Sequence, residues 1–171
     1  ILNLSVGACS KRGMSENSAL VKGVNRAWDA GLVVVVAAGN NGPRTMSITT
    51  PGISRKVITV GCSDDDREVL VGGNRMVDYS GRGPTAACIC KPDLVAPGCS
   101  VVSCSSRADK YTIKSGTSMS TPIVSGAVAL LLERLPDMSN KDVKLRLRES
   151  SVDIGLPRNQ QGWGLLDVGK M

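Results

Sequence analysis

The sequence of 171 residues contains no histidine and no phenylalanine. Without histidine, these residues cannot supply the imidazole base of a Ser-His-Asp site, and a typical zinc site is also disfavoured. Aromatic residues make up only 2% of the chain, which leaves no platform on which nucleic-acid bases could stack. The net charge is +6, but the basic residues are scattered. We therefore expect no nucleic-acid partner.

Long apolar runs are also missing. None reaches the roughly 18 residues that a membrane-spanning helix needs, and we expect no membrane contact. The longest runs, residues 32–38 and 127–132, have the length of core elements. The chain opens on an apolar segment, residues 1–6, that is typical of a strand inside a domain. We therefore expect residues 1–171 to be one portion of a longer domain whose N-terminal part is missing.

The cysteines form no CxxC pair and the sequence has no histidine, so a typical zinc site is not indicated. Two of them are separated by a single residue, which is too close for a relaxed disulfide. We interpret the cysteines as isolated small core residues, and their number alone assigns no compartment. The set is Cys9, Cys62, Cys88, Cys90, Cys99 and Cys104.

Strand-like and helix-like segments alternate along the chain, which predicts an α/β fold with a mostly parallel sheet. Residues 32–38 are apolar throughout, as expected of a strand buried on both faces. The continuous apolar character from Ser118 to Leu132 predicts a helix buried all round. Other predicted helices span residues 15–31, ending at Gly31, and a segment after Ser139, with Asp142 in its first turn. Further strands or extended segments are expected at residues 1–6, 56–61, 91–97 and 100–104, and an exposed loop at 64–68.

The segment Gly116-Thr117-Ser118-Met119-Ser120-Thr121-Pro122 carries the clearest chemical signal. Ser118 is expected where a loop meets a helix start, and the free amides there stabilise a developing oxyanion. Gly116 permits close approach of a substrate backbone, and Pro122 is tolerated in a first helical turn. The alternative is that these hydroxyl residues only cap a core helix.

Two further strand ends suggest a binding site. Asn40 follows the strand at residues 32–38, and its side-chain amide could donate to an oxyanion at the carboxyl edge of the sheet. The strand at residues 1–6 is followed by Gly7, which could leave backbone groups free to pair with an extended peptide. Each also has an ordinary interpretation, as a turn or as a plain strand end.

Together these segments resemble the subtilisin-like serine proteases, or subtilases, over nearly the whole chain. Five segments match in order, at residues 1–7, 34–42, 57–61, 92–98 and 116–122, and residues 162–168 resemble the closing segment of the family. The resemblance implies a partial subtilisin-like three-layer α/β fold and a serine endopeptidase as the parent protein. It also suggests a cis peptide bond at Thr50-Pro51. Ile123 departs from the histidine that many members carry there, but that histidine is not catalytic.

The resemblance assigns roles to individual residues. Ser118 matches the nucleophile, and Asn40 matches the oxyanion-hole amide that acts together with the Ser118 backbone N–H. The implied substrate-binding residues are Ser5, Val6 and Gly7, which pair with the substrate backbone, Ala37, Ala38 and Gly39, which form one wall of the primary specificity pocket, and Gly116 and Thr117 beside the nucleophile.

The main departure from the family is an absence. Its catalytic Asp and His precede the Asn and Ser along the chain, and no acid here, including Asp93, matches that Asp. We therefore expect this chain alone to be essentially inactive, with a polypeptide substrate and the N-terminal half of the domain as partners. Self-association through exposed sheet or core is a further expectation. We assign no metal and no cofactor, and a non-catalytic pseudoprotease or peptide-binding module stays the alternative.

Overall fold

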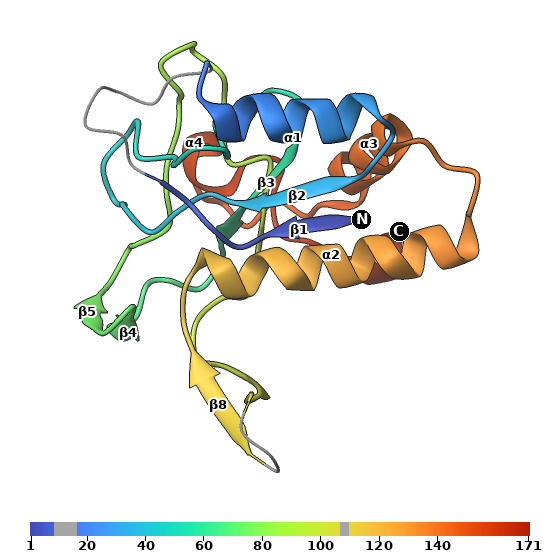
Figure 1. Cartoon of the computed structure of the whole chain (residues 1–171). Coiled ribbons are helices and arrows are strands. Elements are labelled where there is room, and N and C mark those ends of the chain that lie inside the picture. The colour runs from blue at the N-terminus through green and yellow to red at the C-terminus, as the bar shows by residue number, and fades with distance from the viewer. Residues whose placement is uncertain (9–16, 107–109) are drawn as a thin grey trace.

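The computed structural model describes residues 1–8, 17–106 and 110–171. Its central sheet is parallel, with the strand order β1-β2-β3-β6, and α1 and α2 lie on opposite faces of it (Figure 1). The α/β fold with a mostly parallel sheet is therefore confirmed. The elements are β1 (Leu2–Leu4), α1 (Ala19–Asp29), β2 (Val34–Ala37), β3 (Ile58–Cys62), β4 (Val69–Val71), β5 (Asn74–Met76), β6 (Leu94–Ala96), β7 (Val101–Cys104), β8 (Tyr111–Lys114), α2 (Thr117–Arg134), α3 (Asn140–Ser150), α4 (Arg158–Gln161) and the 3₁₀ helix η1 (Val168–Lys170).

Strand β2 lies at the centre of the core. All four of its residues are buried, and it pairs in parallel with β1 on one side and β3 on the other. The predicted strand began at Leu32, but that residue is exposed and its amide donates to the Ala27 carbonyl at the end of α1. The continuous valines of β2 therefore give the sheet its buried middle, as the sequence predicted.

Helix α1 is confirmed with shifted ends. Ser18 is its N-cap and accepts a hydrogen bond from the Val21 amide at 3.3 Å. The helix ends at Asp29, Ala30 caps it, and Gly31 follows with a φ of 92°, a conformation that favours glycine. The start of the predicted segment, residues 15 and 16, lies outside the described residues.

Helix α2 differs from its prediction. It packs against the sheet through a buried side that includes Val124, Val128 and Leu131, but Leu130 on another side is 58% exposed. The prediction that it is buried all round is therefore wrong for the described residues. An apolar run shows that a helix can be buried, but the neighbouring elements decide how many of its sides are covered.

Helix α3 begins as predicted. The Ser139 hydroxyl accepts from the Asp142 amide, and the Asp142 carboxylate accepts from the Ser139 amide, both at 3.2 Å, which makes a complete capping box. Three short features were not predicted from the sequence: the antiparallel pair β4–β5, the strand β8 that pairs with β7, and the helix α4. Each is four residues long or shorter and too brief to show a hydrophobic period.

Two expectations about polar and thiol side chains are wrong. Among the described cysteines only Cys62 is a buried core residue, and burial raises its pKa to about 12. Cys88, Cys90 and Cys104 are exposed and Cys99 is half-buried, whereas Cys9 lies outside the described residues. Asp65, expected in an exposed loop, is buried because its carboxylate accepts a hydrogen bond from the Ser80 amide at 2.7 Å. No helix of the described ranges is long and apolar enough to cross a bilayer.

Candidate active site

Ser118 is the second residue of α2, at the carboxyl edge of the sheet. Gly116 is the N-cap with a φ of 139°, and its carbonyl accepts from the Met119 amide at 2.9 Å. Within the described residues the Ser118 amide has no hydrogen-bond partner. It is one of the unpaired donors of a helix start, where the helix dipole adds positive potential.

Pro122 shapes the site in a way that the sequence analysis did not predict. It lies one turn further into α2 than expected, where a residue with an N–H would donate to the Ser118 carbonyl four positions earlier. Proline has no N–H, and the Ser5 hydroxyl donates to that carbonyl instead, at 2.9 Å. The Ser118 hydroxyl in turn donates to the Ser5 carbonyl at 3.0 Å. This reciprocal serine pair ties the end of β1 to the start of α2.

Asn40 is held by Thr117 in one orientation. Its Oδ1 accepts hydrogen bonds from both the amide and the hydroxyl of Thr117, each at 3.0 Å. The Thr117 hydroxyl also accepts from the Gly39 amide at 3.2 Å and is fully buried. Because these bonds fix the oxygen of the Asn40 amide, its Nδ2 remains available, and it has no partner within residues 1–8, 17–106 and 110–171.

A pocket of about 300 Å³ lies beside Ser118. Most of its lining was predicted, but Thr49 was not identified from the sequence. The Thr49 side chain lies so close to Gly7 and Gly39 that a Cβ on either glycine would collide with it. Thr49 therefore limits the depth of the pocket. The lining residues are Gly7, Ala37, Gly39, Asn40, Asn41, Thr49, Thr117 and Ser118.

Predicted substrate-binding residues outside this lining have other places. Ala38 is fully buried, and its carbonyl accepts from the Thr49 amide at 2.9 Å, so it supports the wall from behind. Val6 is exposed, and neither Val6 nor Gly7 forms a backbone hydrogen bond to the other described residues. Thr50-Pro51 is a cis peptide bond, as expected, and Thr50 pairs with Ala8.

The site offers hydrogen-bond donors but no base. None of the residues that line the pocket has an ionisable side chain. Within the described ranges no three His, Cys, Asp or Glu side chains are grouped where they could hold a metal ion. The arrangement can therefore orient a carbonyl and stabilise negative charge on its oxygen, but the proton of the Ser118 hydroxyl must go to a group from elsewhere.

Solved structures of proteases superpose on this chain. Sphericase superposes with a TM-score of 0.77 at 31% sequence identity, over 97% of this chain and 56% of that one. The protease domain of PatA, solved as an S218A mutant, gives a TM-score of 0.74 at 26% identity and is covered to 56%.

Proteins with similar sequences are also proteases. Serine protease AprX of Bacillus subtilis is 39% identical over 165 residues, which is 88% of this chain and 37% of that protein. Subtilisin DY of Bacillus licheniformis is 34% identical over 170 residues, 98% of this chain and 55% of that protein. The chain thus spans little more than half of these relatives at most. The model of the Subtilase family matches residues 1–164, and the chain therefore belongs to the subtilases, a family of serine proteases.

Proposed function

We propose that this chain supplies the nucleophile and the oxyanion hole of a serine endopeptidase. One observation carries the proposal: the Ser118 hydroxyl, the Ser118 amide and the Asn40 Nδ2 belong to residues that line one pocket. These are the groups that acyl transfer requires, a hydroxyl to attack and two donors for the oxygen of the carbonyl under attack. No histidine occurs in the sequence, so the base is a residue outside these 171.

The proposed reaction has two steps. The substrate backbone pairs with the free groups at Val6 and Gly7, and a side chain enters the pocket above Thr49. Ser118 Oγ bonds to the peptide carbonyl carbon while its proton passes to the external base. The peptide C–N bond breaks as the base returns the proton to the leaving amine, which leaves an acyl-enzyme. Water then attacks the ester and releases Ser118.

In the structure the Ser118 hydroxyl is not activated. It donates its hydrogen bond to the Ser5 carbonyl, which is an acceptor far too weak to remove the proton. The isolated chain should therefore keep only the residual acceleration that binding and the oxyanion hole provide, roughly 10³-fold over water, as is already known from subtilisin. Reaction with a base requires the hydroxyl to rotate away from Ser5.

The complete reading frame tests this proposal. We expect it to hydrolyse a peptide amide and to be labelled by a fluorophosphonate on Ser118, as located by mass spectrometry. This chain alone should be labelled at a far lower rate. A complete protein that binds peptides without labelling or cleavage would support the non-catalytic peptide-binding alternative. Cleavage by this chain alone at the rate of the complete protein would contradict the requirement for an external base.

Replacing Asn40 by leucine should lower kcat about 10²–10³-fold with little change in KM, a magnitude known from subtilisin and carried over here. The reason is that the Nδ2 donor acts on charge that develops only in the transition state. Initial rates on a peptide substrate give both constants. Asn74→Leu, on the exposed β4–β5 hairpin, is the control and should leave both unchanged. A change in KM alone would place Asn40 in ground-state binding.

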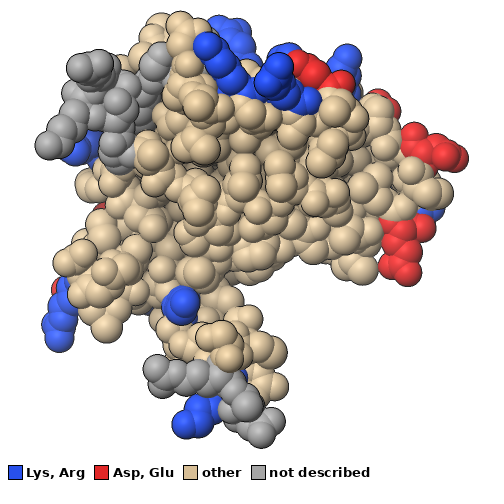
Figure 2. Space-filling view, in the orientation of Figure 1, with Lys and Arg blue, Asp and Glu red and all other residues tan. Residues whose placement is uncertain are grey.

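Self-association of the isolated chain stays a prediction. Among the described strands β1 pairs only with β2, and Ile1, Val6 and Leu130 expose half of their side chains or more. Figure 2 shows that the surface over β1 and α2 is largely uncharged, with Lys and Arg gathered along the edge at α1. An open strand edge beside an apolar surface favours pairing with another chain.

A further inference from the structure

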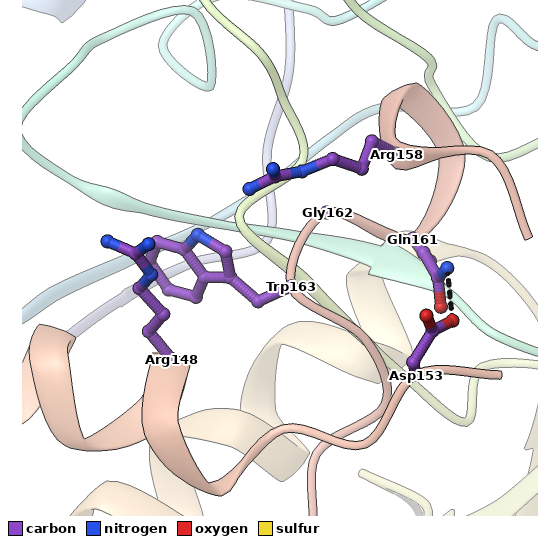
Figure 3. A pocket seen from close by; sticks show the side chains of 6 residues that line it. All are labelled: Arg148, Asp153, Arg158, Gln161, Gly162 and Trp163. Atoms are coloured by element: carbon purple, nitrogen blue, oxygen red, sulfur yellow. Dashed lines mark hydrogen bonds between the residues drawn. The ribbon is translucent and has the colours of Figure 1, made fainter. Parts of the chain in front are cut away.

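A second pocket, of about 270 Å³, lies among α3, α4 and the turn that follows α4 (Figure 3). It shares no lining residue with the pocket at Ser118. Arg148 and Arg158 extend toward the Trp163 indole from two different helices, whereas Asp153 and Gln161 lie at the opposite end. Positive charge and an aromatic surface therefore gather at one end of the pocket.

The two arginines have no anionic partner. Within the described residues neither guanidinium takes part in an ion pair within 4.0 Å or donates a hydrogen bond. The carboxylate of Asp153 is already engaged, because its Oδ1 accepts from the Gln161 Nε2 at 2.7 Å and from the Gly155 amide at 2.8 Å. Asp153 keeps its negative charge at the opposite end of the pocket, so the lining carries two positive charges and one negative charge. The two guanidinium groups beside Trp163, which form no ion pair, therefore attract an anion to their end of the pocket.

The pocket is held in shape from below. Gly162 has a φ of 63°, and a Cβ there would collide with the carbonyls of Pro92 and Asp93, so this turn lies directly on the backbone leading into β6. The Trp163 amide donates to the Asp93 carbonyl at 2.7 Å. Gln161 is buried, and its Oε1 accepts from the Ile154 amide at 2.9 Å. The walls are therefore parts of the fold and need no ligand to form them.

We propose that this pocket binds a tetrahedral dianion, a phosphate or sulfate group, between Arg148 and Arg158. Guanidinium groups match such oxyanions because their N–H donors form paired, charge-assisted hydrogen bonds. The pocket volume of about 270 Å³ is several times the volume of about 30 Å³ that one water occupies, so the pocket has room for more than one small ion. The Trp163 indole offers an apolar surface beside the two arginines. The group can therefore be a free ion or the head of a small organic ester.

The two tryptophans provide the readout. Trp163 lines the pocket, whereas Trp28 is buried in the core and does not line it. The Lys144 ammonium lies 5.8 Å from the centre of the Trp28 ring and 6.0 Å from that of Trp163, so in a ¹H–¹⁵N spectrum the Trp163 indole N–H should report binding directly and that of Trp28 only through its surroundings. Titration with inorganic phosphate, at constant ionic strength set with chloride, should shift the Trp163 signal saturably, with a Kd of about 1 mM or below. The Trp28 signal should shift much less. Phenyl phosphate as a second probe separates the two sources, because tighter binding than phosphate identifies an ester and equal binding identifies the free ion.

Variants complete the test. Arg148→Gln and Arg158→Gln should each weaken phosphate binding about 10-fold or more, the usual effect of losing a charged hydrogen-bond partner. Arg134→Gln at the far end of α2 is the control and should bind normally. Backbone amide signals dispersed like those of the unaltered chain confirm that each variant is folded. Ser118→Ala should bind phosphate like the unaltered chain, so the result is independent of the proposed peptidase. A Trp163 signal that follows ionic strength alone, or normal binding by both variants, would overturn the proposal.

Discussion

Replacing Ser118 by alanine in the complete protein should lower kcat by about 10⁶-fold, the loss already known for the nucleophile of subtilisin. The variant keeps the Asn40 amide and the pocket, so KM should change little. Removing the hydroxyl also removes its bond to the Ser5 carbonyl, but the helix-start amides stay in place. The measurement is single-turnover hydrolysis of a peptide ester and a peptide amide.

Ser125→Ala is the matched control for this variant. Ser125 lies on the same helix, and its hydroxyl donates to the Asn3 side chain at 2.8 Å, so the change removes a comparable contact to β1 without touching the pocket. Its kcat should stay unchanged, because Ser125 does not line the pocket at Ser118. A Ser118→Ala protein with more than a few per cent of normal activity would rule out Ser118 as the nucleophile.

Replacing Asp93 by alanine should lower the free energy of unfolding by about 3–5 kcal/mol, because it leaves a buried ammonium without its partner. Asp93 Oδ2 lies 2.5 Å from Lys91 Nζ and also accepts from the Thr59 amide at 2.7 Å. Oδ1 lies 3.5 Å from Lys144 Nζ. Lys91 is 1% exposed, and its other hydrogen bond goes only to the Val57 carbonyl. Urea unfolding at neutral pH measures the change.

The destabilisation caused by Asp93→Ala should become smaller as the pH rises. Burial lowers the pKa of Lys91 to about 8 in the folded chain, against 10.5 when it is exposed, and without Asp93 it should fall further. A lysine whose pKa is lowered on folding loses its proton first in the folded state. The free energy of unfolding therefore rises with pH between the pKa of Lys91 in the folded chain and its pKa in the unfolded chain. This interval is wider in the Asp93→Ala variant, so the variant gains more stability than the unaltered chain as the pH rises. Asp137→Ala, an exposed acid, is the control. A destabilisation by Asp93→Ala below about 1 kcal/mol, or one that grows toward pH 10, would contradict this account.

The parts of the fold that local sequence determines were predicted well. A run of consecutive valines such as that in β2 is stable only when the whole strand is buried. Ser139 and Asp142 form the complete N-terminal capping box of α3 without any other residue. Ser118 at the start of α2 and Asn40 after β2 follow from the same local patterns. These predictions depend on residues a few positions apart, which is the range over which propensity and periodicity operate.

The features that were missed depend on contacts between distant segments. Thr49 closes the pocket only because the chain after Asn40 folds back on Ala38. Lys91 and Asp93 would be placed on the surface by their type, and their burial follows from partners on β3 and α3. Leu130 is exposed because no described element covers that side of α2. No window of sequence contains this information.

The serine pair that joins β1 to α2 restricts how segments can be exchanged between related chains. In a chimaera joined anywhere between Ser5 and Pro122, these two residues come from different parents. The proline is tolerated in α2 because the Ser5 hydroxyl donates the hydrogen bond to the Ser118 carbonyl that a backbone N–H at position 122 would otherwise supply. A chimaera that inherits the proline without a hydroxyl at position 5 leaves the Ser118 carbonyl unpaired, at a cost of about 1–3 kcal/mol at the nucleophile itself. The two segments should therefore be inherited from the same parent.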